Sequence, residues 1–136
     1  MPSFRVSDAA RFLGVSDDTV RRWAENGSLT PLKDESGRLV VDGLELATLA
    51  SEQAKLPEDP SRARSSARNR FVGLVTAITA DTVMAQVELQ CGPFRVVSLM
   101  SSEAVRELGL ELGSVATAVV KATTVIIESP HGKALV

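Results

Sequence analysis

Apolar residues follow two different patterns along this chain, and the change between them falls near residue 65. Before about residue 56, apolar positions recur at helical spacing, which is typical of amphipathic helices that bury one face. Beyond residue 70, apolar runs rich in valine, isoleucine and threonine are typical of strands. We therefore expect a helical N-terminal part and a β-rich C-terminal part. The stretches with helical spacing are residues 8–13, 17–26 and 43–50.

Short polar side chains stand at the expected start of each helix. Ser7, Ser16 and Asp42 carry oxygens that can accept a backbone N–H from the first turn. Gly14 is a stop signal for the first helix, and an Asn-Gly pair is one for the second. The apolar residues expected to face a shared core are Ala9, Ala10, Phe12, Leu13, Val20, Trp23, Leu44, Leu46, Ala47, Leu49 and Ala50.

After the second helix, a polar Lys-Asp-Glu-Ser-Gly-Arg turn separates two apolar runs, at residues 29–32 and 39–41. A polar turn between apolar runs predicts a β-hairpin, or wing. Two short helices separated by Gly-Val-Ser form the helix-turn-helix pattern, whose second helix enters the major groove of DNA. The two helices alone leave a plain helical hairpin open as the alternative.

The C-terminal part predicts a small barrel. Five short strands within about 60 residues indicate a Greek-key-like arrangement. The expected strands are residues 71–80, 83–89, 94–99, 116–121 and 125–128. A short helix, capped by Ser101 or Ser102 and ended by Gly109, should lie between the third and fourth strands. So small an apolar barrel is expected to bury part of its surface by self-association.

A charged segment with two prolines, Leu-Pro-Glu-Asp-Pro-Ser-Arg-Ala-Arg, joins the two parts and has the composition of a linker. The fold class predicted is α+β in two domains. Residues 1–56 would form a winged helix-turn-helix and residues 57–64 a linker. Residues 65–130 would form a five-stranded barrel with one short helix, and residues 131–136 a flexible tail.

Composition and charge narrow the classes of function. The 136 residues carry a net charge of −2, so any contact with DNA must come from a local basic patch. No apolar stretch reaches the roughly 18 residues of a membrane span, and the start of the chain lacks the apolar core of a signal peptide. We therefore expect a cytoplasmic protein without a membrane partner. The single cysteine, Cys91, has no partner for a disulfide or a zinc site.

The polar residues between the predicted strands carry the chemistry. Arg68 and Lys121 are cations with hydroxyl residues nearby, and Ser101 and Ser102 form a third polar cluster. Cations with several O–H and N–H donors suit a tetrahedral oxyanion, although such residues also occur simply as polar strand ends. The sequence has no cluster that suits a metal cation and no nucleophile–base pair, so we expect a non-enzyme.

The N-terminal stretch R-V-S-D-A-A-R-F-L-G-V-S-D-D-T-V-R-R-W-A-E-N-G-S-L resembles the winged helix-turn-helix of MerR-type and excisionase-type DNA-binding modules over about residues 4–52. Trp23 and the Arg-Leu pair in the wing bring it closer to the excisionase branch. Asp17 and Asp18 would oppose a close approach to DNA. The resemblance implies that DNA is contacted by Thr19, Arg21 and Arg22 on the second helix and by Lys33 and Arg38 on the wing.

The C-terminal stretches S-A-R-N-R-F-V-G, V-M-A-Q-V-E-L and V-V-K-A-T-T-V resemble the molybdate-binding Mop domain of the TOBE class over about residues 65–128. Such domains are OB-like barrels, found in molbindins and in molybdate-responsive regulators, that bind molybdate or tungstate between subunits. Relatives often carry a serine where this chain has Ala104. The resemblance implies an oxyanion site made by Ser66, Ala67 through its backbone, Arg68, Ser101, Lys121, Ala122 and Thr123.

One copy of the domain implies a symmetric homo-oligomer, in which Arg68 of one subunit would meet Lys121 of another around a shared anion. The favoured hypothesis is a molybdate-responsive transcriptional regulator, with molybdate or tungstate as ligand and DNA as partner. The alternative is a molybdate storage or buffering protein whose helix-turn-helix does not act on DNA. An accessory domain of a transporter ATPase is a third possibility, but the sequence has no P-loop.

Overall fold

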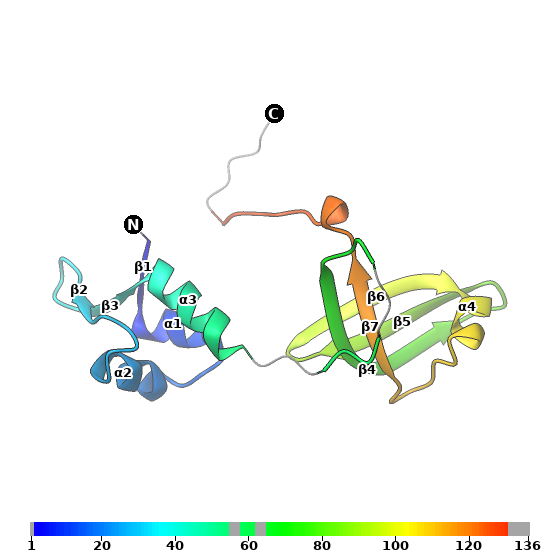
Figure 1. Cartoon of the computed structure of the whole chain (residues 1–136), viewed down its shortest axis with the longest axis horizontal. Helices are drawn as coiled ribbons and strands as arrows, with labels where there is room; N and C mark the ends of the chain where they lie inside the picture. Colours follow the sequence, from blue (N-terminus) through cyan, green and yellow to red (C-terminus); the bar gives the residue numbers. More distant parts are fainter. Residues whose placement is uncertain (1, 55–57, 62–64, 131–136) are drawn as a thin grey trace. The chain divides into compact units, whose positions relative to one another are not determined.

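The computed structural model describes residues 2–54, 58–61 and 65–130 of the chain. It divides into two compact units, Met1–Leu56 and Pro57–Val136. The predicted flexible tail, residues 131–136, lies outside the described residues, and so does half of the predicted linker. Each unit has its own sheet and its own hydrophobic core (Figure 1).

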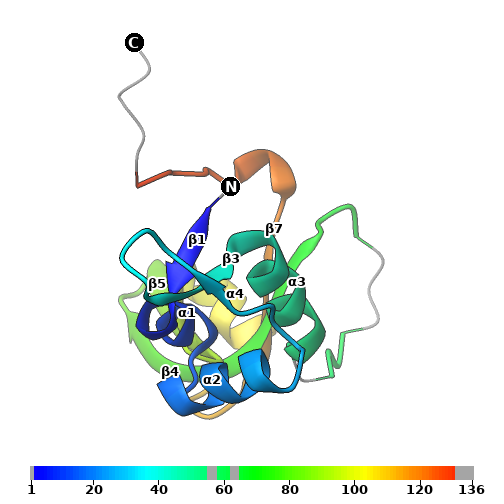
Figure 2. The ribbon, with the colours of Figure 1, turned by 90° about the vertical axis from the view of Figure 1, so that its left-hand side faces the viewer.

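The N-terminal unit packs three helices against a small antiparallel sheet with strand order β1-β3-β2. The short first strand was absent from the prediction. It pairs with β3, opposite Val40, Val41 and Asp42. In chain order the elements are β1 (Ser3–Arg5), α1 (Val6–Leu13), α2 (Asp17–Glu25), β2 (Leu32–Lys33), β3 (Leu39–Asp42) and α3 (Gly43–Gln53). The hairpin of β2 and β3 is the predicted wing, and its loop extends beyond the paired strands (Figure 2).

Two of the three predicted helix caps are confirmed. The Ser16 hydroxyl accepts the Thr19 N–H, and the Asp42 carboxylate accepts the Glu45 N–H. The prediction of a cap at Ser7 is wrong, because α1 begins one residue earlier and no side chain caps it. Since Arg5 is still paired within the sheet, the chain passes directly from strand into helix and leaves no room for a capping serine.

The core of this unit is closed. Ala9, Val20, Leu29 and Val41 have no exposed surface at all. Not every residue predicted for this core is buried, since Phe12 is 70% exposed. Its ring contacts the ring of Phe4 edge-on instead. The exposed predicted core residues are Phe12, Leu44 and Ala47, and Trp23 is half-buried.

The C-terminal unit is a curled antiparallel sheet with strand order β6-β5-β4-β7, which forms a half-barrel (Figure 1). The long first strand bridges its two halves, because residues 69–74 pair with β7 and residues 74–80 pair with β5. The elements are β4 (Asn69–Ala80), β5 (Met84–Cys91), β6 (Phe94–Ser101), α4 (Ser102–Glu107), β7 (Val115–Val120) and the 3₁₀ turn η1 (Ala122–Thr124). The capping residue of α4 is Ser101.

The bend of β4 has an identifiable cause in Gly73. A Cβ atom at this position would lie 2.5 Å from the carbonyl oxygen of Gln90 and 2.6 Å from the sulfur of Cys91. Only glycine allows such a close approach of backbone to backbone. The register then shifts between Val75 and Ala77, so the strand both bends and bulges as the sheet curls.

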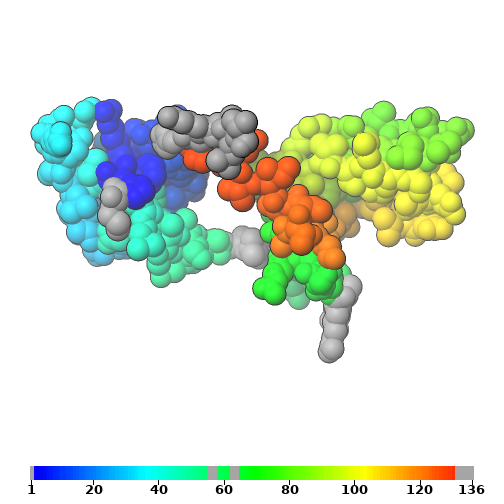
Figure 3. Space-filling model, turned by 90° about the horizontal axis from the view of Figure 1, so that it is seen from above, coloured from blue at the N-terminus to red at the C-terminus, as the bar shows by residue number. Residues whose placement is uncertain are grey.

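The prediction of a fifth strand at residues 125–128 is wrong. The chain turns through η1 immediately after β7, and residues 125–128 pair with none of the described strands. Ile126 and Ile127 are 84% and 86% exposed. In the space-filling view, orange atoms of this part of the chain are visible at the surface (Figure 3). Residues 125–128 have side chains typical of a strand, but no described strand pairs with them.

The concave side of the half-barrel is correspondingly open. An apolar cavity of about 440 Å³ lies between β5, β6, β7 and the connection after α4. Its walls include Val87, Leu89, Val96, Met100 and Leu110. β6 and β7 are the edge strands of the described sheet, and each pairs on one side only. Residues of both strands line the cavity. Across the described residues, no helix has the length and apolar character needed to cross a membrane.

Candidate functional site

The two motifs predicted to bind an oxyanion, 53 residues apart in sequence, meet at one end of the β4–β7 pair. Asn69 of β4 lies opposite Val120 of β7, and its side-chain amide donates a hydrogen bond of 3.1 Å to the Val120 carbonyl. Arg68 precedes this pair on one strand and Lys121 follows it on the other. The two cations therefore flank the same strand pair within one chain. The prediction that Arg68 of one subunit meets Lys121 of another around a shared anion stays a prediction.

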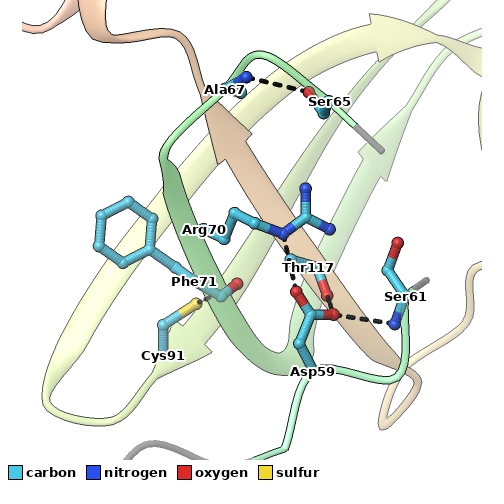
Figure 4. Close-up of polar contacts among 8 residues, drawn as sticks. All are labelled: Asp59, Ser61, Ser65, Ala67, Arg70, Phe71, Cys91 and Thr117. Carbon is cyan, nitrogen blue, oxygen red and sulfur yellow. Dashed lines mark hydrogen bonds and ion pairs between the residues drawn. The ribbon is translucent and has the colours of Figure 1, made fainter. Parts of the chain in front are cut away.

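The loop before β4 is shaped by its own polar groups (Figure 4). The Ser65 hydroxyl accepts the Ala67 N–H at 3.1 Å, and the Ala67 side chain is buried. Ser66 and Arg68 on either side are exposed. Because the Ala67 N–H already has an acceptor, the groups that this loop leaves open to a ligand are those of Ser66 and Arg68.

The segment after β7 presents a second set of donors. The Lys121 carbonyl accepts hydrogen bonds from the Thr124 N–H, at 2.9 Å, and from the Thr124 hydroxyl, at 2.8 Å. This closes the η1 turn, and Lys121, Ala122 and Thr123 are all exposed. The predicted residues of this motif are therefore open to solvent at the end of β7.

Within the described part of the chain, neither Arg68 nor Lys121 has a carboxylate within ion-pair distance. Two other cations of this unit do have such partners, since Arg70 pairs with Asp59 and Arg95 with Glu88. Two unpaired cations at one end of a strand pair create a local positive potential, which favours a small anion.

Arg70, two residues after Arg68, has a structural role. Its Nε donates to Asp59 at 2.8 Å, and the same carboxylate accepts the Thr117 hydroxyl at 3.0 Å and the Ser61 N–H at 2.9 Å (Figure 4). The hydrogen bond from Arg70, with the others, holds the pKa of Asp59 below its ordinary value. Part of the predicted linker is therefore fastened to β4 and β7, the two strands that end in the candidate anion residues.

Ser101 lies elsewhere in the sheet. It pairs with Met84 at the start of β5, near the end of β4 that is remote from Asn69. Its hydroxyl oxygen accepts the Ala104 N–H at 3.0 Å and so caps α4. Ser102 is buried and donates to the Asp81 carbonyl. One chain therefore does not bring Ser101 to the end of the sheet that carries Arg68 and Lys121.

In the N-terminal unit, the candidate DNA-binding residues of α2 differ in how free they are. Thr19 is half-buried, and its hydroxyl shares a hydrogen bond of 2.9 Å with the Ser16 hydroxyl at the helix start. Arg22 is exposed, and Arg21 is exposed with a long contact of 3.4 Å to Asp18. The two arginines are therefore available to a ligand, whereas Thr19 is largely committed to the helix cap.

The wing is organised by Asp34. Its carboxylate accepts the Ser36 N–H at 2.8 Å and the Arg38 N–H at 2.9 Å, which closes the loop between β2 and β3. The backbone hydrogen bond from Arg38 is the largest cause that holds the pKa of Asp34 below its ordinary value. Lys33 at the end of β2 and Arg38 on the loop are both exposed, so the wing presents two cations.

A groove of about 300 Å³ brings Arg21 of α2 and Arg38 of the wing together. Arg5 of β1 lines the same groove, as does Asp17 at the start of α2. Arg22, Thr19 and Lys33 do not line it. Arg5 was missed from the sequence, because its place beside the wing depends on the pairing of β1 with β3. A lone arginine before a helix gives no local signal of that pairing.

Comparison with known proteins gives two family matches and several relatives. Residues 65–127 match the TOBE domain, and residues 3–54 match a helix-turn-helix domain. Molybdenum-pterin-binding protein 2 of Clostridium pasteurianum is 41% identical over 63 residues, which cover 46% of this chain and 93% of that protein. The molybdenum transport protein ModE of Herbaspirillum seropedicae is 35% identical over 65 residues, but these cover only 24% of its length.

Among solved structures, MopII from Clostridium pasteurianum is 39% identical and matches over 48% of this chain and 100% of its own, with a TM-score of 0.46.

Proposed function

The chain belongs to the TOBE-domain family through its C-terminal unit and carries a helix-turn-helix domain in its N-terminal unit, and we propose that it is a molybdate- or tungstate-binding regulator of transcription. It acts by binding rather than by catalysis, in the cytoplasm, where it has access to DNA. The observation that carries the first half of this proposal is the juxtaposition of Arg68 and Lys121, two exposed cations without a described acidic partner.

A tetrahedral dianion fits this pair of cations. Two positive charges held close together repel each other in the empty site, and a doubly negative ligand relieves that repulsion. Ser66 and Thr123 add exposed hydroxyls beside the cations, and hydrogen bonds from charged donors to an oxyanion are strong. The relative from Clostridium pasteurianum is named for a molybdenum-pterin. The donors at this end of the sheet suit the oxygens of molybdate itself.

The full site is proposed to form between copies of the chain. Ser101 lies at another end of the sheet, so it joins Arg68 and Lys121 only if a second copy supplies it. The open half-barrel supports self-association, because its apolar cavity and the exposed Ile126 and Ile127 would otherwise remain in contact with water. We propose that a homo-oligomer covers both, with the anion bound where the subunits meet.

The N-terminal unit supports DNA as a second partner. Arg21, Arg22, Lys33 and Arg38 are exposed on α2 and the wing, the two elements with which winged helix-turn-helix modules contact DNA. A sequence match to ModE, over a quarter of that protein, agrees with a role linked to molybdenum. In the proposed function, anion occupancy changes the assembly, and the assembly sets how pairs of DNA-binding units are presented.

A thermal-shift titration with molybdate, with sulfate as the control anion, tests the binding proposal. A ligand that binds the native state adds roughly 2.7 kcal/mol per site at about 100 times its Kd, which raises Tm visibly. We expect a rise specific to molybdate or tungstate that is lost in Arg68→Ala and Lys121→Ala. Arg106→Ala, which removes an exposed cation from α4, is the matched control and should keep the rise. An equal rise with sulfate would refute the proposed specificity.

The regulatory and storage hypotheses are separated by DNA binding. We expect the protein to retain duplex DNA in a gel shift at low salt, and the retained fraction to change on addition of molybdate. If the protein binds molybdate but retains no DNA at low salt, the storage function is correct and the regulatory one is wrong.

A further inference from the structure

The groove between α2 and the wing is built from three elements, each of which contributes one arginine. Arg5 comes from β1, Arg21 from α2 and Arg38 from the wing loop directly before β3. All three side chains are exposed. The groove has a volume of about 300 Å³ and is open to solvent.

The strand register explains why Arg5 reaches this groove. Arg5 lies directly opposite Val40 in the β1–β3 pair, so the two side chains project from the same face of the sheet. Arg38 stands two residues before Val40, which directs it to that face as well. Val40 is buried although it is outside the main core cluster. The aliphatic stem of Arg5 can cover Val40 while its guanidinium stays in the groove.

The charge within the groove is positive. Three guanidinium groups line it against one carboxylate, that of Asp17. Asp34 on the wing also lies within the field of Arg5 and Arg38, both of which help to lower its pKa. Arg21 and Arg38 touch their acidic neighbours only at 3.4 and 3.5 Å, and such exposed pairs contribute little, so a ligand can replace them. In the described chain, Arg5 has no carboxylate at ion-pair distance.

We propose that this groove clamps one phosphate of the DNA backbone, with Arg5 as a contact alongside Arg21 and Arg38. The inference rests on the proposed binding of DNA and specifies where the backbone lies on this unit. Guanidinium groups present forked N–H donors that match phosphate oxygens. A phosphate contact positions the duplex without reading its sequence, so Arg5 should contribute equally to all sequences.

The salt dependence of DNA binding measures this contact. We would titrate a fluorescein-labelled duplex of random sequence with the full chain at several salt concentrations and follow its anisotropy. Each phosphate contact adds about 0.9 to the slope of log K against log salt. From about 50 to about 200 mM salt, wild type should therefore lose about threefold more affinity than Arg5→Ala. Arg5→Lys, which keeps the charge, should restore most of the slope.

Arg11→Ala is the matched control for this experiment. Arg11 is an exposed arginine of the same unit, on α1, and it pairs with Asp8 outside the groove. Its removal changes the net charge equally, so it corrects for long-range electrostatics. Asp17→Asn provides an independent test of opposite sign, because it removes the groove's own carboxylate and should tighten binding at low salt.

The outcomes separate this inference from the proposed function. A smaller slope for Arg5→Ala than for Arg11→Ala supports the phosphate clamp. Equal slopes for the two variants, with wild type still bound, overturn the clamp and leave DNA binding intact. If wild type shows no binding at low salt, both the clamp and the DNA-binding function are wrong. Circular dichroism of each variant verifies that the unit has folded.

Discussion

The two units of this chain bury their apolar residues to very different extents. In the N-terminal unit Val20, Leu29 and Val41 have no exposed surface. In the C-terminal unit Ile126 and Ile127 are 84% and 86% exposed, and an apolar cavity of about 440 Å³ remains open. The first unit completes its core within one chain, and the second leaves strand-forming residues without a partner.

In the proposed function, the two units divide the work along this difference. A closed core suits a module that meets DNA as an independent body, with its cations on the outside. An open half-barrel suits a module whose structure and ligand site are both completed by another copy. In the C-terminal unit Lys121 and the exposed Ile126 and Ile127 all follow the end of β7, so assembly and anion binding should be coupled.

The largest effect should come from the closed core. Leu29→Ala removes a fully buried side chain, and such truncations cost about 2–5 kcal/mol of unfolding free energy. The matched truncation Ile127→Ala, at an exposed position, should change the unfolding of dilute monomer by less than about 0.5 kcal/mol. Urea unfolding of both variants at low protein concentration measures the contrast. Equal losses would mean that residue 127 is packed within the monomer.

The next largest effect should appear in self-association. Ile126→Asp puts a charge on the surface that we expect to be covered, and losing the burial of one isoleucine costs about 1.5–3 kcal/mol. Association should weaken by about tenfold or more, as measured by size-exclusion chromatography with light scattering. Phe12→Asp, at an apolar residue of the N-terminal unit that is 70% exposed, is the control and should leave the mass unchanged. If the mass falls in Phe12→Asp and not in Ile126→Asp, self-association depends on the N-terminal unit, and the comparison between the two units is wrong.

A smaller effect should follow from the amide that joins the two anion motifs. Asn69→Ala removes the hydrogen bond to the Val120 carbonyl, which is worth about 1 kcal/mol, so molybdate affinity should fall about fivefold by calorimetry. Gln90→Ala removes a similar bond, to the Gly92 carbonyl at the β5–β6 turn, and should have no such effect on affinity. If the two variants bind molybdate alike, Asn69 does not position the site.

The smallest effect should be a dependence on pH. Because the folded chain lowers the pKa of Asp59, the ionised carboxylate stabilises the fold above its unfolded pKa of about 3.9. That stabilisation is lost as the pH falls through the lower, folded value. Asp59→Asn should therefore have a lower Tm than wild type at neutral pH, and the difference should shrink below about pH 4. A difference that is independent of pH would mean that the Asp59–Arg70 ion pair contributes nothing.

Apart from the cap at Ser7, features of the fold that depend on local sequence were predicted correctly. The caps at Ser16 and Asp42 and the strand β5 follow from neighbouring residues, and each is confirmed. The missed strand β1 depends on pairing with β3, more than 30 residues away, and three residues carry too little pattern to reveal it. The fifth strand failed for the opposite reason, since its pattern is clear but none of the described strands pairs with it.

The same distinction applies to the candidate sites. Arg68 and Lys121 were identified through their motifs, and the β4–β7 register explains why those motifs belong together. The contact of Asp59 with Arg70 was hidden in a segment whose composition indicates a linker. Arg5 became a candidate only when the sheet brought it beside the wing. Long-range pairing thus accounts for what the sequence alone did not reveal.

The coupling of anion binding to assembly is tested most directly by sedimentation velocity over a range of protein concentrations, with molybdate or with sulfate. If the anion binds where subunits meet, it binds the assembled form more tightly and must shift the equilibrium toward it. We predict that molybdate moves the monomer-to-oligomer transition to lower protein concentration, that sulfate does not, and that Lys121→Ala abolishes the shift. A monomer that binds molybdate without any change in assembly would contradict a site completed by a second copy.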